Sequence, residues 1–401
     1  MLSSSAVIVL FVALACSYWL TLLTSRPPPI ANFVQRTPSR FRKSPAALTQ
    51  TATLRDKTAF VTGAAGFLGS NLVEQLLVQG WHVTALVRPR SNTTLLSSIA
   101  AQSNAVARLA VVEGDVTDYA SLQRTVPSNV AVVFHVAAIV SLWNGRAQQC
   151  YDVNVLGTRN VVDVCLEKNA QKLVHTSSNA VYAGPGLQND ADVTESTPRF
   201  GLGNWLAYPY TKAQAEIEVL AGISDGQFAV IVNPGGILGK YDINGFARVG
   251  RMLKRGEVPA VPDSVQPMGS ATAIAKAHIA AAERGVLGRS YNLCGKTQPF
   301  QKLLVWAGEA IGVNGDKLVL PSVLLYPVGL FNNFLALFTG NEPDLSFDLL
   351  YNFAHERNGC NSDRAVAELG YEVIDTDEKA RAAVHESMRW LIANNKLDGE
   401  Q

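Results

Sequence analysis

Short apolar runs alternate with amphipathic stretches along the chain from residue 56 onward. Apolar runs between polar or glycine residues are typical of buried strands, and apolar residues spaced three and four apart are typical of helices that bury one face. The predicted strands are Thr58–Thr62, His82–Val87, Ala110–Val112, Val130–His135 and Leu173–Thr176, and the predicted helices include Ser70–Gln79 and Asn154–Lys168. Strands that alternate with helices form βαβ units, so the pattern predicts an α/β fold with a doubly wound parallel sheet.

An uncharged apolar run, Ala6–Leu23, precedes this pattern and is long enough to span a bilayer. Six basic residues and no acid lie between this run and Asp56. By the positive-inside rule, we expect a single-pass membrane protein of the endoplasmic reticulum, with a transmembrane helix over residues 1–24, a basic linker over 25–55 and the rest of the chain in the cytosol. Two other interpretations stay open: a cleaved signal peptide or presequence for an organelle such as a plastid, and a buried helix.

Composition narrows the classes of function. The formal net charge of +1 provides no basic field for binding nucleic acid. Hydrophobic residues make up 48% of the chain and charged residues 17%, below the usual ~25%, which excludes disorder and indicates contact with lipid or apolar ligands. The five cysteines are far apart and the six histidines are scattered, so the sequence predicts neither a disulfide framework nor a metal site.

A glycine-rich turn joins the first predicted strand to the first predicted helix, in the segment Gly63-Ala-Ala-Gly66-Phe67-Leu68-Gly69. Gly63 permits a tight turn, Gly66 lets backbone N–H groups approach a pyrophosphate, and Gly69 lets the helix pack close to the strand. The helix N-terminus adds partial positive charge. This strand, turn and helix predict a dinucleotide-binding site of the Rossmann type, with Phe67 and Leu68 in its cofactor-binding turn.

The second predicted strand ends where the adenosine ribose would lie. NAD enzymes usually place an acid there, but this chain has Val87-Arg88-Pro89-Arg90 and no acid between Glu74 and Glu113. We therefore expect NADP rather than NAD, with Arg88, aided by Arg90, pairing with the 2′-phosphate. Further residues expected at the cofactor follow the third and fourth strands and are Asp115, Val116, Ala137 and Ala138.

The segment Tyr208-Pro-Tyr-Thr-Lys212 places a phenol and an ammonium four residues apart, on one face of a helix. A phenol is a poor acid or base at neutral pH, and a neighbouring ammonium lowers its pKa toward the working range. Ser177 and Ser178 follow the fifth predicted strand, where a hydroxyl can donate to a substrate carbonyl. These residues predict proton transfer coupled to hydride transfer.

The motifs TGAAGFLG, GDVTD, VFHVAA, NVLGTRNVV, HTSSNAVYAG, YPYTK and NPGGILG occur in this order. Over Asp56–Leu391 the chain resembles the extended short-chain dehydrogenase/reductase family, nearest its 3β-hydroxysteroid dehydrogenase and dihydroflavonol 4-reductase branch. The resemblance implies Tyr208 as general acid/base, Lys212 on the nicotinamide ribose and Ser178 orienting the carbonyl, with Ser177 as a fallback. It also implies that Asn154 is mainly structural and that the nicotinamide end is closed by Pro234, Gly235 and Gly236.

The resemblance divides the chain into an NADP-binding Rossmann domain and a smaller C-terminal substrate-binding domain. The first takes residues 56–235, with 264–296 returning to the sheet, and the second takes 236–263 and 297–401. One departure lies at Gly269–Ala275, where relatives carry two acids before a helix and this chain has none. The apolar segment Leu318–Phe338 is either a pair of core helices or a lipid-facing or pocket-lining lid.

Three functions share these motifs. The missing acid after the second strand and the apolar N-terminal run favour an NADP(H)-dependent oxidoreductase that interconverts a ketone or aldehyde and an alcohol on a small lipophilic substrate. The alternatives are a nucleotide-sugar epimerase or dehydratase and a non-catalytic NADP-binding sensor. We expect the membrane as a partner, a second copy of the chain as a candidate partner, and no nucleic acid.

Overall fold

A computed structural model of the protein describes residues 30, 39–43, 52–184, 187, 192–355 and 358–398. The apolar run at residues 6–23, expected to be a transmembrane helix, lies outside the described residues. Part of the expected linker is described and packs on the folded unit: the backbone N–H of Ser39 donates to the Asp225 carboxylate at 3.1 Å, and that of Lys43 donates to the Asp225 carbonyl oxygen.

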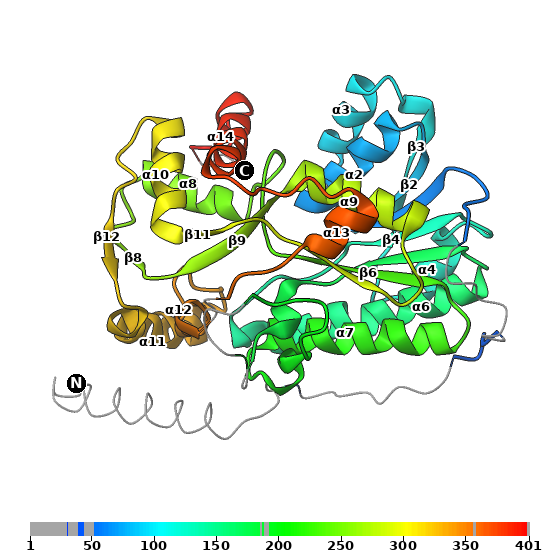
Figure 1. The fold of residues 1–401 in the computed structure, drawn as a ribbon, viewed down its shortest axis with the longest axis horizontal. Coiled ribbons are helices and arrows are strands. Elements are labelled where there is room, and N and C mark those ends of the chain that lie inside the picture. Colours follow the sequence, from blue (N-terminus) through cyan, green and yellow to red (C-terminus); the bar gives the residue numbers. More distant parts are fainter. Residues whose placement is uncertain are drawn as a thin grey trace.

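The centre of the molecule is a seven-stranded sheet in the order β10-β6-β5-β4-β1-β2-β3, and every neighbouring pair is parallel (Figure 1). The expectation of a doubly wound parallel sheet is therefore confirmed. The chain builds β1, β2 and β3 toward one edge and then returns to place β4 on the other side of β1. The strands are β1 Thr58–Thr62, β2 His82–Val87, β3 Leu109–Glu113, β4 Val132–His135, β5 Lys172–Thr176, β6 Ala229–Pro234 and β10 Ser290–Leu293.

Helices cover both faces of this sheet, as its nearly continuous apolar strands require. One face packs on α2 Phe67–Val78, α3 Thr94–Gln102 and α9 Ala271–Arg284. The opposite face packs on α4 Tyr119–Thr125, α6 Gly157–Glu167 and α7 Ala207–Ser224. Shorter helices lie in the connections: η2 Val106–Arg108, η3 Asn144–Arg146, α5 Ala147–Tyr151, the π-helical turn η4 Asp152–Leu156, η5 Asn179–Tyr182 and η6 Phe200–Gly203.

A smaller unit lies beside the carboxyl ends of the strands and has its own core (Figure 1). It contains a three-stranded sheet in the order β11-β9-β7 and a two-stranded sheet of β12 and β8. Its strands are β7 Gly236–Leu238, β8 Ala260–Pro262, β9 Val265–Ser270, β11 Thr297–Pro299 and β12 Leu318–Leu320. Its helices are α8 Phe246–Lys254, α10 Phe300–Ile311, α11 Ser322–Thr339, α12 Phe347–His355 and α14 Asp377–Ala393.

The structure divides the chain differently from the expected domains at two places. Strand β9 belongs to the smaller sheet, although residues 264–296 were expected to return to the large one. Helix α13, Asp363–Leu369, packs against α9, and Leu369 and Tyr371 belong to the core of the large unit. The expected boundaries followed the order of motifs along the chain, which does not reveal that the C-terminal segment returns to the large unit.

The segment that lacks two acids still begins a helix. Ser270 is the N-cap residue of α9, and its side chain accepts from the backbone N–H of Ala273 at 3.5 Å. Serine is as good an N-cap as aspartate, so a neutral hydroxyl takes over the capping role. The departure at Gly269–Ala275 therefore leaves the C-terminal architecture intact.

A disulfide joins Cys294, at the end of β10, to Cys360, just before α13. The expectation of no disulfide was therefore wrong. The two cysteines are 66 residues apart in the sequence, and only the fold brings their Cα atoms to 5.9 Å. The bridge fastens the segment after α12 to the edge of the large sheet.

We expect Cys360→Ser to lower the free energy of unfolding by about 2–4 kcal/mol, because the bridge closes a long loop in the unfolded chain. Denaturant titration without reductant measures the change. Reductant should destabilise the wild type by a similar amount and leave Cys360→Ser unaffected. Recovery of Cys294 and Cys360 as separate peptides, mapped without reductant, would contradict the bridge.

Candidate active site

The glycine-rich turn is packed too closely for side chains. Gly63 has a φ of +67°, and a Cβ there would lie 2.8 Å from the Ala137 Cα atom. A Cβ on Gly69 would lie 2.0 Å from the Gly63 carbonyl oxygen. Helix α2 begins at Phe67, three residues before the expected Ser70, and its N-cap residue Gly66 supplies no capping side chain. The first N–H groups of α2 thus stay open to an anion, and the turn fits a pyrophosphate.

The contact between Gly63 and Ala137 lies where the chain reverses direction across the sheet, between β1 and β4. Ligands of doubly wound sheets bind at this switch point. The Thr62 hydroxyl accepts from the backbone N–H groups of Val136 and Ala137, each at 3.1 Å, and contacts the His135 ring at 2.8 Å. The Ala137-Ala138 backbone is thereby held beside the glycine turn, as the expected cofactor position requires.

A buried histidine fixes this arrangement. Burial lowers the pKa of His135 to about 3, so its ring is neutral at physiological pH. The Thr158 hydroxyl donates to the Asn154 carbonyl oxygen at 2.6 Å, so His135 Nε2 donates to Thr158 and His135 Nδ1 accepts from Thr62. One directed chain of hydrogen bonds connects η4 to the end of β1.

The residues expected at the adenosine end lie at the carboxyl ends of β2 and β3. Arg88 and Arg90 are exposed, and neither side chain pairs with another of the described residues. The Asp115 carboxylate accepts from the backbone N–H and the hydroxyl of Thr117, both at 2.8 Å, and Val116 is buried. Two guanidinium groups that pair with none of the described residues therefore lie next to an ordered acidic turn.

Lys212 is buried near the start of α7, one helical turn after Tyr208. Its ammonium donates to the Thr176 carbonyl oxygen at the end of β5, at 2.7 Å. Burial lowers the pKa of Lys212 to about 8, although the carboxylate of Glu216 raises it. Pro209 lies in the first turn of α7, where its missing N–H costs no hydrogen bond.

Tyr208 is half-buried, whereas Tyr210 is buried and receives a hydrogen bond from Gln214 at 3.4 Å. Burial raises the pKa of Tyr210, which makes it a poorer proton donor. Tyr208, and not Tyr210, shares the helix face of Lys212.

The two strand-end serines have different environments. The Ser177 hydroxyl donates its one proton to Glu216 at 2.6 Å, so it has no second proton to donate to a substrate. The Ser178 hydroxyl accepts from the backbone N–H of Ala180 at 3.2 Å, which leaves its own proton to donate. The structure thus favours Ser178 over Ser177 as the donor to a substrate oxygen.

Glu216, which the sequence analysis did not single out, is the centre of a buried polar cluster. Its carboxylate accepts from Ser177, from the Asn233 amide at 2.7 Å and from the Arg199 guanidinium at 2.8 Å. The Asn233 amide also donates to the Ser178 carbonyl oxygen at 3.2 Å. Its spacing of four residues from Lys212 was the signal that could have identified it.

The Asn154 side chain is engaged in hydrogen bonds that connect neighbouring segments. Its amide oxygen accepts from the Ile139 backbone N–H at 2.8 Å, and its amide nitrogen donates to Ile139 and Thr211. The Pro234-Gly235-Gly236 segment follows β6, where a Cβ on Gly235 would lie 2.3 Å from the Pro267 carbonyl oxygen. Its glycines thus permit close contact with β9, a packing reason in addition to the expected one.

An aromatic cluster that the sequence analysis missed lies next to the catalytic end of α7. Trp205, three residues before Tyr208, contacts Tyr351 with ring centroids 5.1 Å apart and Phe347 at 6.4 Å. Tyr326 of α11 contacts Phe347 at 5.1 Å. These four rings, here called the aromatic wall, join the segment just before α7 to α11 and α12.

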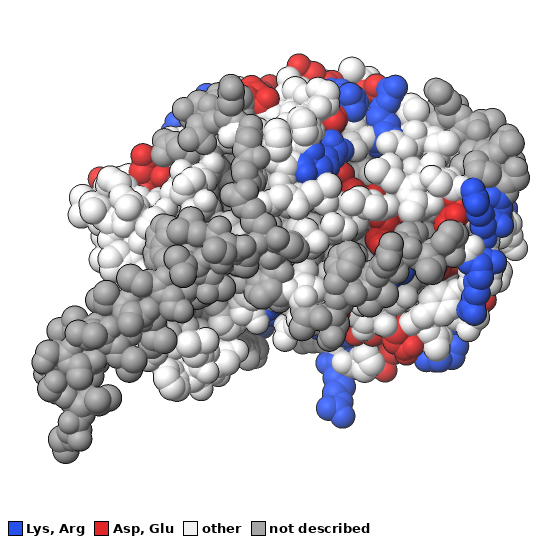
Figure 2. Space-filling view, turned by 90° about the horizontal axis from the view of Figure 1, so that it is seen from below, with Lys and Arg blue, Asp and Glu red and all other residues white. Residues whose placement is uncertain are grey.

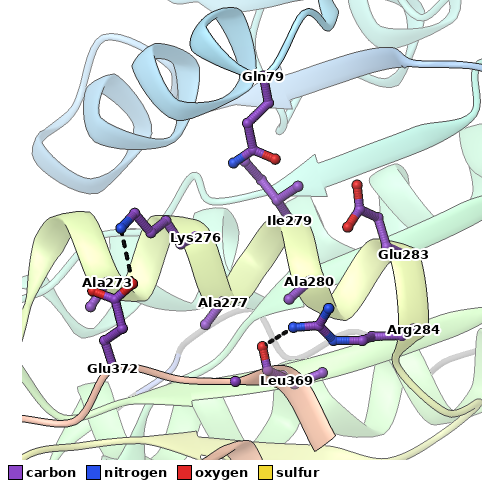
Figure 3. Close-up of a pocket in the computed structure, with 11 residues that line it drawn as sticks. Gln79, Ala273, Lys276, Ala277, Ile279, Ala280, Glu283, Arg284, Leu369 and Glu372 are labelled. Atoms are coloured by element: carbon purple, nitrogen blue, oxygen red, sulfur yellow. Dashed lines mark hydrogen bonds and ion pairs between the residues drawn. The ribbon is translucent and has the colours of Figure 1, made fainter.

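A surface cavity of about 250 Å³ lies along α9, on the face of the sheet opposite α7 (Figure 3). Both of its cations are engaged by neighbouring lining residues: Lys276 pairs with Glu372 at 3.0 Å, and Arg284 donates to the Leu369 carbonyl oxygen. None of the expected catalytic residues lines it. This cavity is separate from the candidate active site.

The glycine turn at the switch point, together with a Tyr208/Lys212 pair and strand-end serines, defines an NAD(P)-dependent enzyme of the extended short-chain dehydrogenase/reductase class. The sequence profile of the NAD dependent epimerase/dehydratase family matches residues 59–294. The chain belongs to this family, whose members bind a nicotinamide dinucleotide.

Two proteins of known name are similar to this chain in sequence. Sterol demethylase protein B of Methylococcus capsulatus is 30% identical over 344 residues, which cover 83% of this chain and 98% of the relative. A 3 beta-hydroxysteroid dehydrogenase/Delta 5-->4-isomerase of Mycobacterium tuberculosis is 36% identical over 206 residues, 49% of this chain and 52% of the relative.

Solved structures agree in fold. The crystal structure of gox2253 has a TM-score of 0.69 and 29% identity, covering 85% of this chain and 99% of that one. UDP-glucose 4-epimerase from Bifidobacterium longum, solved with NAD+ and UDP, has a TM-score of 0.65 and 20% identity, over 84% and 99% of the two chains. The second similarity shows the shared fold alone.

We expect kcat/KM to fall as the pH rises above about 8, because Lys212 then loses its charge. Glu216→Gln removes a carboxylate that raises the pKa of Lys212, so the fall should begin at a lower pH. Glu218→Gln, on the same helix and paired with Arg159 at 2.9 Å, is the matched control and should leave the profile unchanged. A Glu216→Gln profile identical to that of the wild type would contradict this coupling.

Proposed function

We propose that the protein is an NADP(H)-dependent oxidoreductase that interconverts a ketone or aldehyde and an alcohol on a lipophilic, steroid-, flavonoid- or lipid-like substrate. The observation that carries the proposal is the buried Lys212 ammonium, which donates to the Thr176 carbonyl oxygen at the end of β5 and lies one helical turn after Tyr208. A protein that only sensed NADP would have no use for a charge buried beside a phenol.

When bound, the nicotinamide supplies or accepts the hydride. In the reducing direction the Tyr208 hydroxyl donates its proton to the carbonyl oxygen, and the Ser178 hydroxyl donates a hydrogen bond to the same oxygen. The Lys212 ammonium, on the same helix face as Tyr208, would favour the phenolate that remains after proton transfer and would hold the nicotinamide ribose. Hydride on carbon and a proton on oxygen together give the alcohol, and oxidation runs the same steps in reverse.

The aromatic wall supports a lipophilic substrate. Trp205, three residues before Tyr208, packs on Phe347 and Tyr351 in an apolar, aromatic cluster, whereas a sugar diphosphate would require cations there. The names of the sterol demethylase and hydroxysteroid dehydrogenase relatives point to the same class of substrate. A nucleotide-sugar epimerase or dehydratase is the alternative, and similarity in fold is its main support.

NADP is proposed because Arg88 and Arg90 are exposed at the end of β2 and pair with no other residue that the structure describes, and a guanidinium there can pair with a 2′-phosphate. We also propose that residues 1–24 attach the protein to a membrane. The basic residues after the apolar run favour a cytosolic position for the enzyme, whereas the Cys294–Cys360 disulfide favours an oxidising compartment. An organelle reached through a cleaved presequence is therefore the alternative.

Tyr208→Phe keeps the ring and removes the proton, so turnover should fall ~10²–10⁴-fold with little change in NADPH affinity. Oxidation of NADPH with steroid ketones, dihydroflavonols and UDP-sugars as substrates measures this and identifies the substrate class. Tyr210→Phe, two residues along the same helix, is the control and should stay within a few-fold of the wild type. The opposite result would assign the proton to Tyr210.

Arg88→Asp should reverse the cofactor preference, because it replaces the partner of a 2′-phosphate by an acid that accepts from ribose hydroxyls. The ratio of kcat/KM for NADPH to that for NADH measures the preference. Arg108→Asp, at the opposite end of the neighbouring strand, is the control and should leave the ratio unchanged. Equal kcat/KM for both cofactors in the wild type would contradict the assignment of NADP.

A further inference from the structure

Helix α11 presents its large apolar residues outward. Its buried positions are small or polar: Ser322, Gly329, Asn333 and Ala336. The Asn333 amide donates to the buried Asp348 carboxylate of α12 at 2.7 Å. Its exposed positions are large and apolar, with Leu337 77% and Phe338 76% exposed, and they include Val323, Leu324, Val328 and Leu335. This arrangement is the reverse of that in a helix on the surface of a soluble protein.

The exposed apolar face is too wide for a single partner helix. At ~100° per residue, the positions from Leu337 through Val323 and Leu324 to Val328 span about 180° of the helix circumference. A helix that packs on another buries a stripe of roughly 100°. The face also continues onto β12, where Leu318 is 63% exposed. An extended apolar medium covers such a surface better than one segment of protein does.

No charged residue lies on this face. The sequence has no charged residue from Leu318 to Gly340. The two acids that follow are neutralised by arginines, Glu342 by Arg146 at 3.3 Å and Asp344 by Arg248. Figure 2, which views the molecule from below Figure 1, shows most of the charged side chains of the described residues toward the right and the top of the view.

We propose that α11 and β12 form a membrane-docking face that lies in the surface of a lipid bilayer. Among the described helices, α11 alone is long and apolar enough to cross a membrane. It lies on the bilayer rather than crossing it, because β12 pairs with β8 and the Asn333 bond holds α11 on α12.

The docking face connects to the candidate active site through the aromatic wall. Tyr326 of α11 contacts Phe347, which contacts Trp205 beside Tyr208. If the proposed function holds, a substrate dissolved in the bilayer reaches the catalytic residues along this wall without crossing water. Docking itself requires only the exposed apolar residues.

The test places the photoreactive residue p-benzoylphenylalanine at Phe338 in the full chain, reconstituted with phosphatidylcholine vesicles. Irradiation should give adducts with lipid. The matched control carries the same residue at Val106 of η2, an equally apolar position that is 67% exposed and belongs to the large unit, and should give none. Adducts between position 338 and another part of the chain, or a second copy of it, would show that protein and not lipid covers this face, and would overturn the proposal. The absence of lipid adducts would overturn it as well.

A second variant keeps the docking test separate from the enzymatic one. Val323→Gln, Leu324→Gln, Leu335→Gln and Leu337→Gln together should reduce lipid adducts at position 338 at least tenfold, while NADPH oxidation with a detergent-dispersed substrate stays within twofold of the wild type. Undiminished lipid adducts would overturn the proposal. Tyr208→Phe should give the reverse pattern, with adducts retained and turnover lost.

Discussion

The catalytic end of the molecule depends on one buried charge, the ammonium of Lys212. Removing an ammonium from water costs several kcal/mol unless hydrogen bonds and an opposite charge compensate it. The Thr176 carbonyl oxygen supplies the bond and Glu216 supplies the charge. Glu216 is in turn held by Ser177, Asn233 and Arg199. The ends of β5 and β6 and the first turns of α7 are therefore fixed relative to each other by the requirements of a single side chain, which also keeps Ser178 and Tyr208 in place.

The large sheet could be predicted from the sequence because its signals are local. The bounds of β1 and β2 match the structure residue for residue, since buried parallel strands are continuous apolar runs that end at polar or glycine residues. The predicted start of α2 was three residues too late. Its N-cap residue, Gly66, has no side chain that could cap the helix, so the usual sequence signal of a helix start is absent. Gly63, Tyr208 and Lys212 could be singled out as candidates because each belongs to a motif whose spacing reflects one turn or one helix face.

The rest depends on contacts between residues far apart in the sequence. Cys294 pairs with Cys360, α13 returns to α9, and Trp205 meets Phe347 and Tyr351 across more than a hundred residues. The sequence around each of these cysteines and aromatic residues does not differ from that around other cysteines and aromatic residues of the chain in a way that would reveal its partner. Glu216 is intermediate: its spacing from Lys212 is local, but its partners Arg199 and Asn233 come from separate segments, so its importance is visible only after folding.

Helix α11 shows why an apolar run is ambiguous in sequence. Periodicity tells which residues share a face but not whether that face meets protein or lipid, because both accept large apolar side chains. The deciding feature is the other face: Gly329 and Ala336 let α12 approach, and Asn333 bonds to Asp348. A core helix has no reason to point its small and polar residues inward and its leucines outward. The small residues of α11, rather than its hydrophobic ones, therefore favour the lipid-facing interpretation that the docking proposal adopts.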